Sequence, residues 1–210
     1  MAWTRASHLR SLAETSQFDA LVVGGGITGS GVALDLGARG LRVALVEQSD
    51  FASGTSGRST KLFHGGIRYL PQFEFHLVAE GLHEQAVLAR IADYLFEPLE
   101  FVIPLYRQHG IADAPGWAAR GRRAALALKT GLLLYDLLGG ITRPASRHRH
   151  IPPDEVVDLV PQLKVEGLRS GYVYSDAQTD DARLVFAVTR TAVERYGVTA
   201  VARVRARELR

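Results

Sequence analysis

The fold is decided by one short stretch, Gly24-Gly25-Gly26-Ile27-Thr28-Gly29. Its glycines have the spacing of a turn that joins the end of a strand to the start of a helix. The first allows the tight turn, the second lets the backbone approach a ligand, and the third lets the helix pack against the strand. The free N–H groups at the start of such a helix attract phosphate groups. The stretch therefore predicts a phosphate-binding turn.

The segments on both sides of this turn have the matching patterns. Residues 18–23 (FDALVV) are a short apolar run, which we interpret as a buried parallel strand. Residues 27–39 predict a helix of small and apolar residues, ended by Gly40, where a left-handed residue is favoured. Residues 41–46 (LRVALV) predict a second strand. Strand, glycine turn, helix and strand together predict a βαβ unit of the α/β class.

Glu47 ends the second strand, eighteen residues after Gly29. A carboxylate at this point accepts hydrogen bonds from the ribose hydroxyls of an adenosine and would repel a 2′-phosphate. The unit is therefore predicted to bind a dinucleotide in a Rossmann-like fold. The turn does not distinguish NAD from FAD, because both contain the ADP moiety that it would contact.

The composition excludes several kinds of chemistry. The chain has no cysteine, which rules out disulfides, Cys-ligated zinc, iron–sulfur clusters and thiol catalysis. We predict no metal site. The content of 47% hydrophobic and 22% charged residues is ordinary for a globular protein. Residues 1–17 form a polar leader without a secretory signal. The most apolar stretch, 124–140, contains Lys129 and Asp136 and is too interrupted to span a bilayer.

The chain carries a formal net charge of +3, and its arginines are unevenly distributed. Six of them lie close together: Arg120, Arg122, Arg123, Arg143, Arg147 and Arg149. A basic region can contact nucleic acid, anionic lipid or an anionic substrate. We favour a solvated face over these alternatives and predict no nucleic-acid partner.

Residues 51–69 are rich in serine, threonine and glycine, so we interpret them as a long loop. Long loops in compact domains are usually functional. Further along, we predict helices at 75–90, 124–138 and 181–196, the last with Thr179 or Asp180 as its N-cap, and strands at 100–105, 172–175 and 198–204. Residues 107–123 are predicted to be irregular, and 142–153 to be a basic linker. The region of about 71–170 is interpreted as a helical and irregular insertion.

One long match identifies a family. The text GGGITGSGVALDLGARGLRVALVEQSDFASGTSGRSTKLFHGGIRYL closely resembles the FAD-dependent glycerol-3-phosphate dehydrogenases. The resemblance continues in EFHLVAEGLHEQAVL, LLLYDLLGG and YSDAQTDDARLV, and it covers nearly the whole chain from residue 18 onward. It implies FAD as the cofactor and an FAD/NAD(P)-binding fold of the glutathione-reductase or D-amino-acid-oxidase type, here incomplete.

The resemblance also implies roles for individual residues. Cofactor-binding positions are Gly24, Gly26, Ile27, Thr28, Gly29, Glu47, Gln48, Thr55, Ser56, Ser59, Thr60, Lys61, Leu62, His64 and Gly65. Arg68 and Tyr69 match substrate-pocket positions, with the arginine suited to an anionic phosphate. His64 matches a position beside the flavin, although a structural histidine that bonds the loop backbone is an equal alternative.

The reaction implied by the resemblance is oxidation of sn-glycerol 3-phosphate to dihydroxyacetone phosphate. Hydride would pass to flavin N5, and electrons would continue to a membrane quinone. The family's proteins are much longer, so the resemblance also implies that residues 18–210 are the N-terminal part of an FAD-binding domain, without the substrate-cap and C-terminal domains. A cytoplasmic location, peripheral contact with the inner face of the cell membrane and a full-length homodimer are further expectations.

Three other functions remain open on the sequence. The first is a glycerol-3-phosphate oxidase that passes electrons to oxygen. The second is another FAD oxidoreductase of the same fold, such as an amino-acid oxidase, although the HGGIRYL segment argues against it. The third is a non-catalytic nucleotide-binding fragment.

Overall fold

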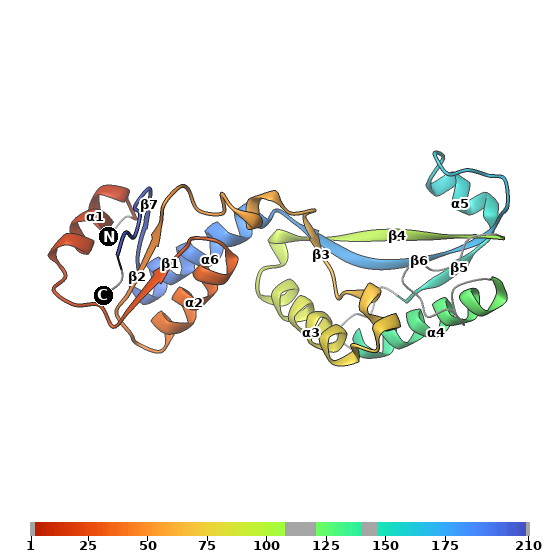
Figure 1. Ribbon diagram of the computed structural model, residues 1–210, viewed down its shortest axis with the longest axis horizontal. Helices are drawn as coiled ribbons and strands as arrows, with labels where there is room; N and C mark the ends of the chain where they lie inside the picture. The colour runs from red at the N-terminus through yellow and green to blue at the C-terminus, as the bar shows by residue number, and fades with distance from the viewer. Residues whose placement is uncertain (1–2, 108–120, 140–146, 209–210) are drawn as a thin grey trace. The chain divides into compact units, whose positions relative to one another are not determined.

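The computed structural model describes residues 3–107, 121–139 and 147–208. These residues form two compact units (Figure 1). The first unit combines Met1–Lys61 with Asp180–Arg210, and the second is Leu62–Thr179. The chain therefore leaves the first unit after the predicted loop has begun and returns to it at the start of the last helix.

The first unit is a three-stranded parallel sheet with helices packed on it. Its strands are β1 (Ala20–Val23), β2 (Val43–Glu47) and β7 (Thr199–Ala202), in the order β1-β2-β7. Both strand pairs are parallel, with Ala20 opposite Val43 and Ala44 opposite Thr199. Helix α2 (Ile27–Ala38) connects β1 to β2, and α6 (Asp181–Tyr196) leads into β7. This confirms the predicted βαβ unit and the α/β class.

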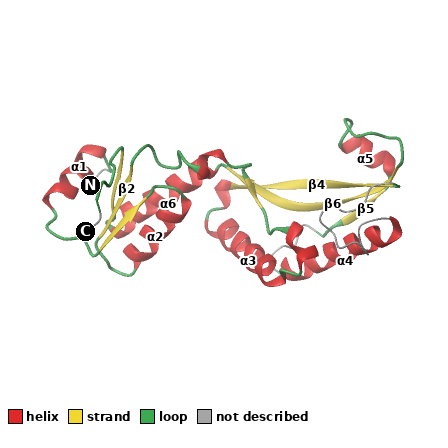
Figure 2. Cartoon of the chain, viewed as in Figure 1, coloured by secondary structure: helices red, strands yellow, loops and turns green. Residues whose placement is uncertain are grey.

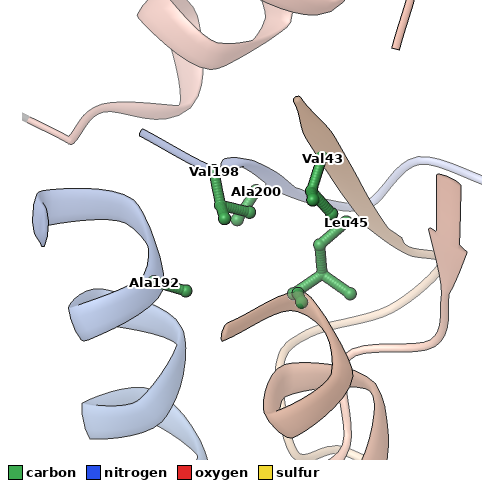
Figure 3. Close-up of a cluster of buried hydrophobic side chains, with 6 residues drawn as sticks. Val43, Leu45, Ala192, Val198 and Ala200 are labelled. Atoms are coloured by element: carbon green, nitrogen blue, oxygen red, sulfur yellow. The ribbon is translucent and has the colours of Figure 1, made fainter. Parts of the chain in front are cut away.

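Small residues let the two helices of this unit pack closely. Ser30 on α2 and Thr189 on α6 are both fully buried, and their hydroxyls are hydrogen-bonded at 2.8 Å. The unit also has an apolar core of Ala33, Val43, Leu45, Ala192, Val198 and Ala200 (Figure 3). The core contains residues from both ends of the chain, so the βαβ unit is completed by segments that are distant in the sequence.

The predicted leader contains a helix. Helix α1 (Arg5–Glu14) begins at Thr4, whose hydroxyl accepts the N–H of Ser7. It lies against β7, where the Trp3 indole donates to the Ala200 carbonyl at 3.3 Å, and His8 Nδ1 accepts the Ala200 N–H at 3.0 Å. The polar composition of 1–17 did not reveal this helix, because its contacts are made by its ends and by single polar groups rather than by an apolar stripe.

The predicted strand at 18–23 differs from the structure in two ways. The strand begins at Ala20, and it is not buried on both faces, because Leu21 and Val23 are 50% and 56% exposed. β1 pairs only with β2 within the described residues, and its alternate side chains face away from the core. Gly40, with φ of +85°, takes the left-handed position that was predicted for it.

The second unit is built on a long antiparallel ribbon. Strand β4 (Phe96–Tyr106) pairs with β6 (Leu168–Thr179) along its whole length, and the short strands β3 (Leu62–Phe63) and β5 (Arg149–Ile151) pair with β6 as well. Its helices are α3 (Phe75–Ile91), α4 (Gly121–Gly139) and α5 (Pro153–Leu159). Short 3₁₀ turns are formed at Thr55–Arg58 in the first unit and at Ile67–Gln72 and Asp93–Leu95 in the second.

Alternate residues of β6 face the two sides of this sheet. Tyr174 packs with the cluster of Val78, Leu82 and Tyr135 from α3 and α4. The preceding residue, Val173, packs with Ile151 and Val156 from β5 and α5. Figure 2 shows α3 and α4 on one side of the β4–β6 ribbon and α5 on the other. The strand period of two therefore assigns each residue of β6 to one helical layer.

Several predictions in this region need correction. The strands predicted at 100–105 and 172–175 are longer in the structure, because the two strands pair with each other beyond their apolar central residues. Residues 121–123 begin α4 rather than being irregular, while 108–120 lie outside the described residues. The predicted linker at 142–153 contains β5 and the start of α5, although its residues up to 146 are likewise outside the description. Among the described helices, none is long and apolar enough to cross a membrane.

Candidate functional site

The glycine turn has the close contacts that the sequence predicted. Gly24 has φ of +112°, and a Cβ on Gly29 would overlap the Gly24 carbonyl oxygen. A Cβ on Gly25 would lie 2.5 Å from the Phe51 ring and 2.9 Å from the Glu47 Cβ. Gly24 is therefore required by its backbone conformation, whereas Gly25 and Gly29 exclude a side chain because it would clash with neighbouring atoms.

Glu47 lies beside this turn. One of its carboxylate oxygens accepts the Gly25 N–H at 2.7 Å and the other accepts the Ser49 N–H at 2.7 Å. Two backbone bonds fix the carboxylate at the end of β2, where the sequence predicted a ribose ligand. Each oxygen has a second lone pair that could accept a hydroxyl proton.

The second predicted segment returns to the glycine turn through Ser56. The Ser56 Oγ accepts the Ile27 N–H at 3.0 Å, and a Cβ on Gly26 would lie 3.2 Å from the same oxygen. The structure thus brings Ser56 together with Gly26 and Ile27, which are thirty and twenty-nine positions before it in the chain. The hydroxyl occupies part of the helix N-terminus, and a phosphate would approach the remaining N–H groups of the first turn.

The other predicted residues of this segment are exposed or make hydrogen bonds away from the glycine turn. The Ser59 hydroxyl donates to Asp181 and accepts the Lys61 N–H at 2.9 Å, so it links the segment to the start of α6. Gln48, Thr55, Thr60 and Lys61 are exposed, and Lys61 has a left-handed φ of +60°. Asp180, one of the two predicted candidates, is the N-cap of α6, where it accepts the N–H groups of Ala182 and Arg183.

The remaining predicted residues belong to the second unit. Leu62 lies on β3 opposite Gln178. His64 is exposed, but the next two residues, Gly65 and Gly66, are buried. A Cβ on Gly65 would overlap Leu82 and lie 2.6 Å from the Tyr135 hydroxyl oxygen, and Gly66 has φ of +77°. The backbone that follows His64 is therefore closely confined.

Arg68 and Tyr69 interact with each other. The guanidinium of Arg68 donates to the Tyr69 hydroxyl at 2.8 Å, and its carbon lies 4.9 Å from the centre of the Tyr69 ring. Arg68 is exposed and Tyr69 is half-buried. The pair presents a cation and a hydroxyl together, which is a suitable combination for an anionic group.

Sequence reasoning missed a group of buried polar residues around Gly65. Asp176 is 4% exposed and accepts hydrogen bonds from the Tyr135 hydroxyl at 2.9 Å and the Gln85 amide at 3.2 Å. Burial and the nearby Asp176 charge raise the pKa of Tyr174 to about 12. The segments YSDAQ and LLLYD contain Asp176 and Tyr135, but no spacing in either segment marks the two residues as partners.

Within the described residues, no cluster of three or more histidine, aspartate or glutamate side chains has the arrangement of a metal site. A dinucleotide cofactor fits the first unit on the geometry alone. Side chains at Gly25 and Gly29 would clash with neighbouring atoms. Helix α2 begins at Gly26, which has no side chain, although Ser56 accepts the Ile27 N–H. A fixed carboxylate lies at the ribose position. The fold and the turn therefore define a dinucleotide-binding protein of the Rossmann type.

Comparisons with known proteins identify the family. Residues 19–210 match the family described as FAD dependent oxidoreductase (DAO). Glycerol-3-phosphate dehydrogenase 2 of Mycobacterium tuberculosis is 44% identical over 94% of this chain and 30% of its own length. Alpha-glycerophosphate oxidase of Streptococcus pyogenes is 42% identical over 87% of this chain and 28% of its own length.

Solved structures agree with the sequence relatives. The glycerol-3-phosphate dehydrogenase of Bacillus halodurans, complexed with FAD, superposes with a TM-score of 0.61 at 30% identity, over 94% of this chain and 28% of its own. L-proline dehydrogenase of P. horikoshii superposes with a TM-score of 0.62 at 19% identity, over 87% of this chain and 43% of its own, which shows the shared fold.

The chain belongs to the FAD dependent oxidoreductase family, as the sequence predicted. Its FAD cofactor and the resemblance to glycerol-3-phosphate dehydrogenases are confirmed by the same comparisons. The chain spans about 30% of the length of the curated dehydrogenases that it matches.

Proposed function

We propose that this chain provides the FAD-binding part of an enzyme that oxidises sn-glycerol 3-phosphate to dihydroxyacetone phosphate. The observation that carries the proposal is the turn at the start of α2, where Gly24, Gly29 and Glu47 form a cradle for an ADP moiety. The substrate is inferred from the names of the relatives, because dehydrogenases and oxidases of glycerol 3-phosphate match over most of the chain.

In the first unit, the pyrophosphate would bind at the α2 N-terminus. The backbone of Gly26, Ile27, Thr28 and Gly29 would face it, with Ser56 and neighbouring hydroxyls alongside. Glu47 would hold the ribose, and Gln48 would lie next to it. The resemblance adds Thr55, Ser59, Thr60, Lys61 and Leu62 to the cofactor contacts. The two backbone bonds to Glu47 would keep its carboxylate in place when FAD is absent.

In the second unit, Arg68 would bind the substrate phosphate and Tyr69 would line the pocket. The Tyr69 hydroxyl and ring hold the guanidinium in one orientation, so less side-chain freedom would be lost when the phosphate binds. His64 and Gly65 would lie beside the flavin. When bound, FAD would accept the hydride from C2 of the substrate.

The electron acceptor distinguishes two forms of this proposal. We favour a membrane quinone, because the Mycobacterium tuberculosis dehydrogenase matches 94% of this chain and the streptococcal oxidase 87%. Such an enzyme would work as a homodimer in the cytoplasm, at the inner face of the cell membrane. The streptococcal oxidase, at 42% identity, makes oxygen the second candidate. Peroxide release during turnover would favour oxygen, and reduction of a quinone analogue without peroxide would favour the quinone.

Binding of FAD is tested first, with the chain of 210 residues. Titration with FAD, followed by quenching of flavin fluorescence, should give saturable binding. Glu47→Gln keeps the size but removes the charge and one of the two acceptor oxygens, so it should weaken FAD binding about tenfold. Glu14→Gln, on the exposed end of α1, is the matched control and should bind like the unchanged chain. Equal affinities of all three proteins would overturn the ribose role.

Substrate choice is tested next, on the flavin-loaded protein without oxygen. Glycerol 3-phosphate should bleach the flavin absorbance, and glycine or proline should not. Arg68→Lys keeps the charge but loses the two-pronged donor geometry, so it should raise the substrate concentration needed for half-reduction by about tenfold. Bleaching by amino acids instead would assign the chain to the amino-acid oxidases. Saturable FAD binding without bleaching by any of these compounds would favour a nucleotide-binding role alone.

A further inference from the structure

The strongest unexplained feature is the buried polar group around Gly65. It contains side chains from three different elements: Gln85 of α3, Tyr135 of α4 and Asp176 of β6. All three are at most 4% exposed. Burial of polar groups is unfavourable unless each finds a partner, and an apolar cluster of the same volume would stabilise the unit at least as well. The burial of these three polar side chains therefore needs an explanation other than stability.

The hydrogen bonds converge on a single short segment of backbone. The Gly65 N–H donates to the Tyr135 hydroxyl oxygen at 3.0 Å and lies 3.3 Å from Asp176 Oδ1. The Tyr135 hydroxyl in turn donates to Asp176, at 2.9 Å. The Gln85 amide nitrogen has two protons, and it donates to Asp176 and to the Phe63 carbonyl. The network thus holds the backbone immediately before and immediately after His64.

Steric contacts confine the same segment. A Cβ on Gly65 would overlap Leu82, and Gly66 has a left-handed φ of +77°. His64 itself is exposed and its side chain projects from this confined backbone. Among the described residues, the Gln85 Oε1 has no hydrogen-bond partner, which costs free energy of folding. The amide is therefore oriented so that its nitrogen can bond Asp176 and the Phe63 carbonyl.

We propose that Gln85, Tyr135 and Asp176 are positioning residues that fix the backbone around His64, so that its imidazole is presented in one place to the bound flavin and substrate. The presentation to flavin rests on the proposed function. The fixing of the backbone does not, because it is a property of the second unit alone. A preorganised group of this kind avoids reorganisation when the ligand binds.

The test uses Tyr135→Phe, which keeps the ring and removes the hydroxyl. Tyr174→Phe is the matched control, because this ring lies 6.1 Å from that of Tyr135 and its hydroxyl makes no hydrogen bond in the part of the chain that the structure describes. In the chain without cofactor, the Gly65 amide should exchange its proton about tenfold faster in Tyr135→Phe and less than about twofold faster in Tyr174→Phe. The His64 imidazole resonances should move only in Tyr135→Phe.

A second variant keeps the test valid if Tyr135→Phe does not fold. Gln85→Met keeps the volume and removes both amide bonds, so it should also move the His64 resonances, with Gly65 exchange about threefold faster. His64 resonances that stay unchanged in each folded variant would overturn the proposal. So would equal shifts in Tyr174→Phe, because a general loosening of the unit would then explain them.

Addition of FAD separates the two proposals. The His64 resonances of the unchanged chain should shift when FAD binds, and the flavin absorption spectrum should differ between Tyr135→Phe and Tyr174→Phe. Failure to bind FAD would contradict the proposed function. The exchange and resonance measurements without cofactor would then still test whether the three residues fix the backbone around His64. FAD binding without any shift of His64 would overturn the presentation to flavin.

Discussion

The two units fix their functional backbone by different means. In the first unit, the turn at Gly24–Gly29 is held by direct contact of backbone with backbone, over an apolar core. In the second, the segment at Gly65 is held by a buried network of polar side chains and by the Leu82 side chain. A backbone contact is rigid, whereas a side chain can move. A side chain should therefore destabilise the first unit at Gly29 more than it destabilises the second unit at Gly65.

The largest effect is expected for Gly29→Ala in the first unit. The new methyl group would overlap the Gly24 carbonyl oxygen, so the turn must open. We expect a loss of about 3 kcal/mol in the free energy of unfolding, together with loss of FAD binding. Gly31→Ala is the matched control on the same helix, since nothing lies within 4 Å of its Cβ. It should stabilise the chain by about 0.5–1 kcal/mol. Urea unfolding checks both, and equal effects would contradict the steric argument.

A smaller effect is expected for Gly65→Ala in the second unit. The methyl group would meet Leu82 and the Tyr135 hydroxyl, which are side-chain atoms that can shift. We expect a loss of about 1–2 kcal/mol in the free energy of unfolding. For Gly81→Ala, whose Cβ would lie 3.4 Å from the Gly65 carbonyl oxygen, the change should stay within about 1 kcal/mol. A loss at Gly65 that exceeds the one at Gly29 would reverse the comparison between the units.

The next effect in size is expected at the start of α6, where the chain re-enters the first unit. Asp180 caps α6 by accepting the N–H groups of Ala182 and Arg183. Asp180→Ala should lower the free energy of unfolding by about 1 kcal/mol, and Asp180→Asn should retain most of it, because the amide oxygen still accepts. Thermal unfolding of the three proteins measures the difference. An Asn variant as unstable as the Ala variant would rule out capping as the cause.

The smallest effect concerns pH and the docking of α1. Burial lowers the pKa of His8 below 6.5, and its Nδ1 accepts the Ala200 N–H, which only the neutral ring can do. The unfolded chain therefore takes up the proton first as the pH falls. The stabilisation by His8 should be full above pH 6.5 and should decrease as the pH falls through the folded-state pKa.

Urea unfolding between about pH 5 and 8 provides the measurement for this effect. The unchanged chain should lose more stability on acidification than His8→Gln. The control is His76→Gln, whose side chain is 94% exposed and which should behave like the unchanged chain. Parallel pH profiles for all three proteins would exclude His8 as the source.

The prediction from sequence succeeded where a local pattern has a local cause. The glycine turn, the two strands of the βαβ unit and the left-handed Gly40 follow from spacing that a single segment contains. The N-cap at Asp180 has the same origin. The leader helix and β5 were missed because both depend on partners elsewhere in the chain: α1 on β7, and β5 on β6.

The candidate site shows the same division. The resemblance pointed to His64, Gly65 and Arg68 from a contiguous motif. It did not reveal that Tyr135 and Asp176, 70 and 111 residues away from Gly65, hold that glycine. No spacing rule links a tyrosine on one helix and an aspartate on a distant strand to a common backbone partner.

The sequence by itself determined the cofactor class and the βαβ unit, because a phosphate-binding turn requires glycines at fixed intervals, and those intervals can be read along the chain. The tertiary structure decided how each turn is held in place. Gly29 is confined by a carbonyl five residues before it, whereas Gly65 is confined by α3, α4 and β6. Hydrogen bonds and contacts between distant segments depend on packing, and packing is settled only when the chain has folded.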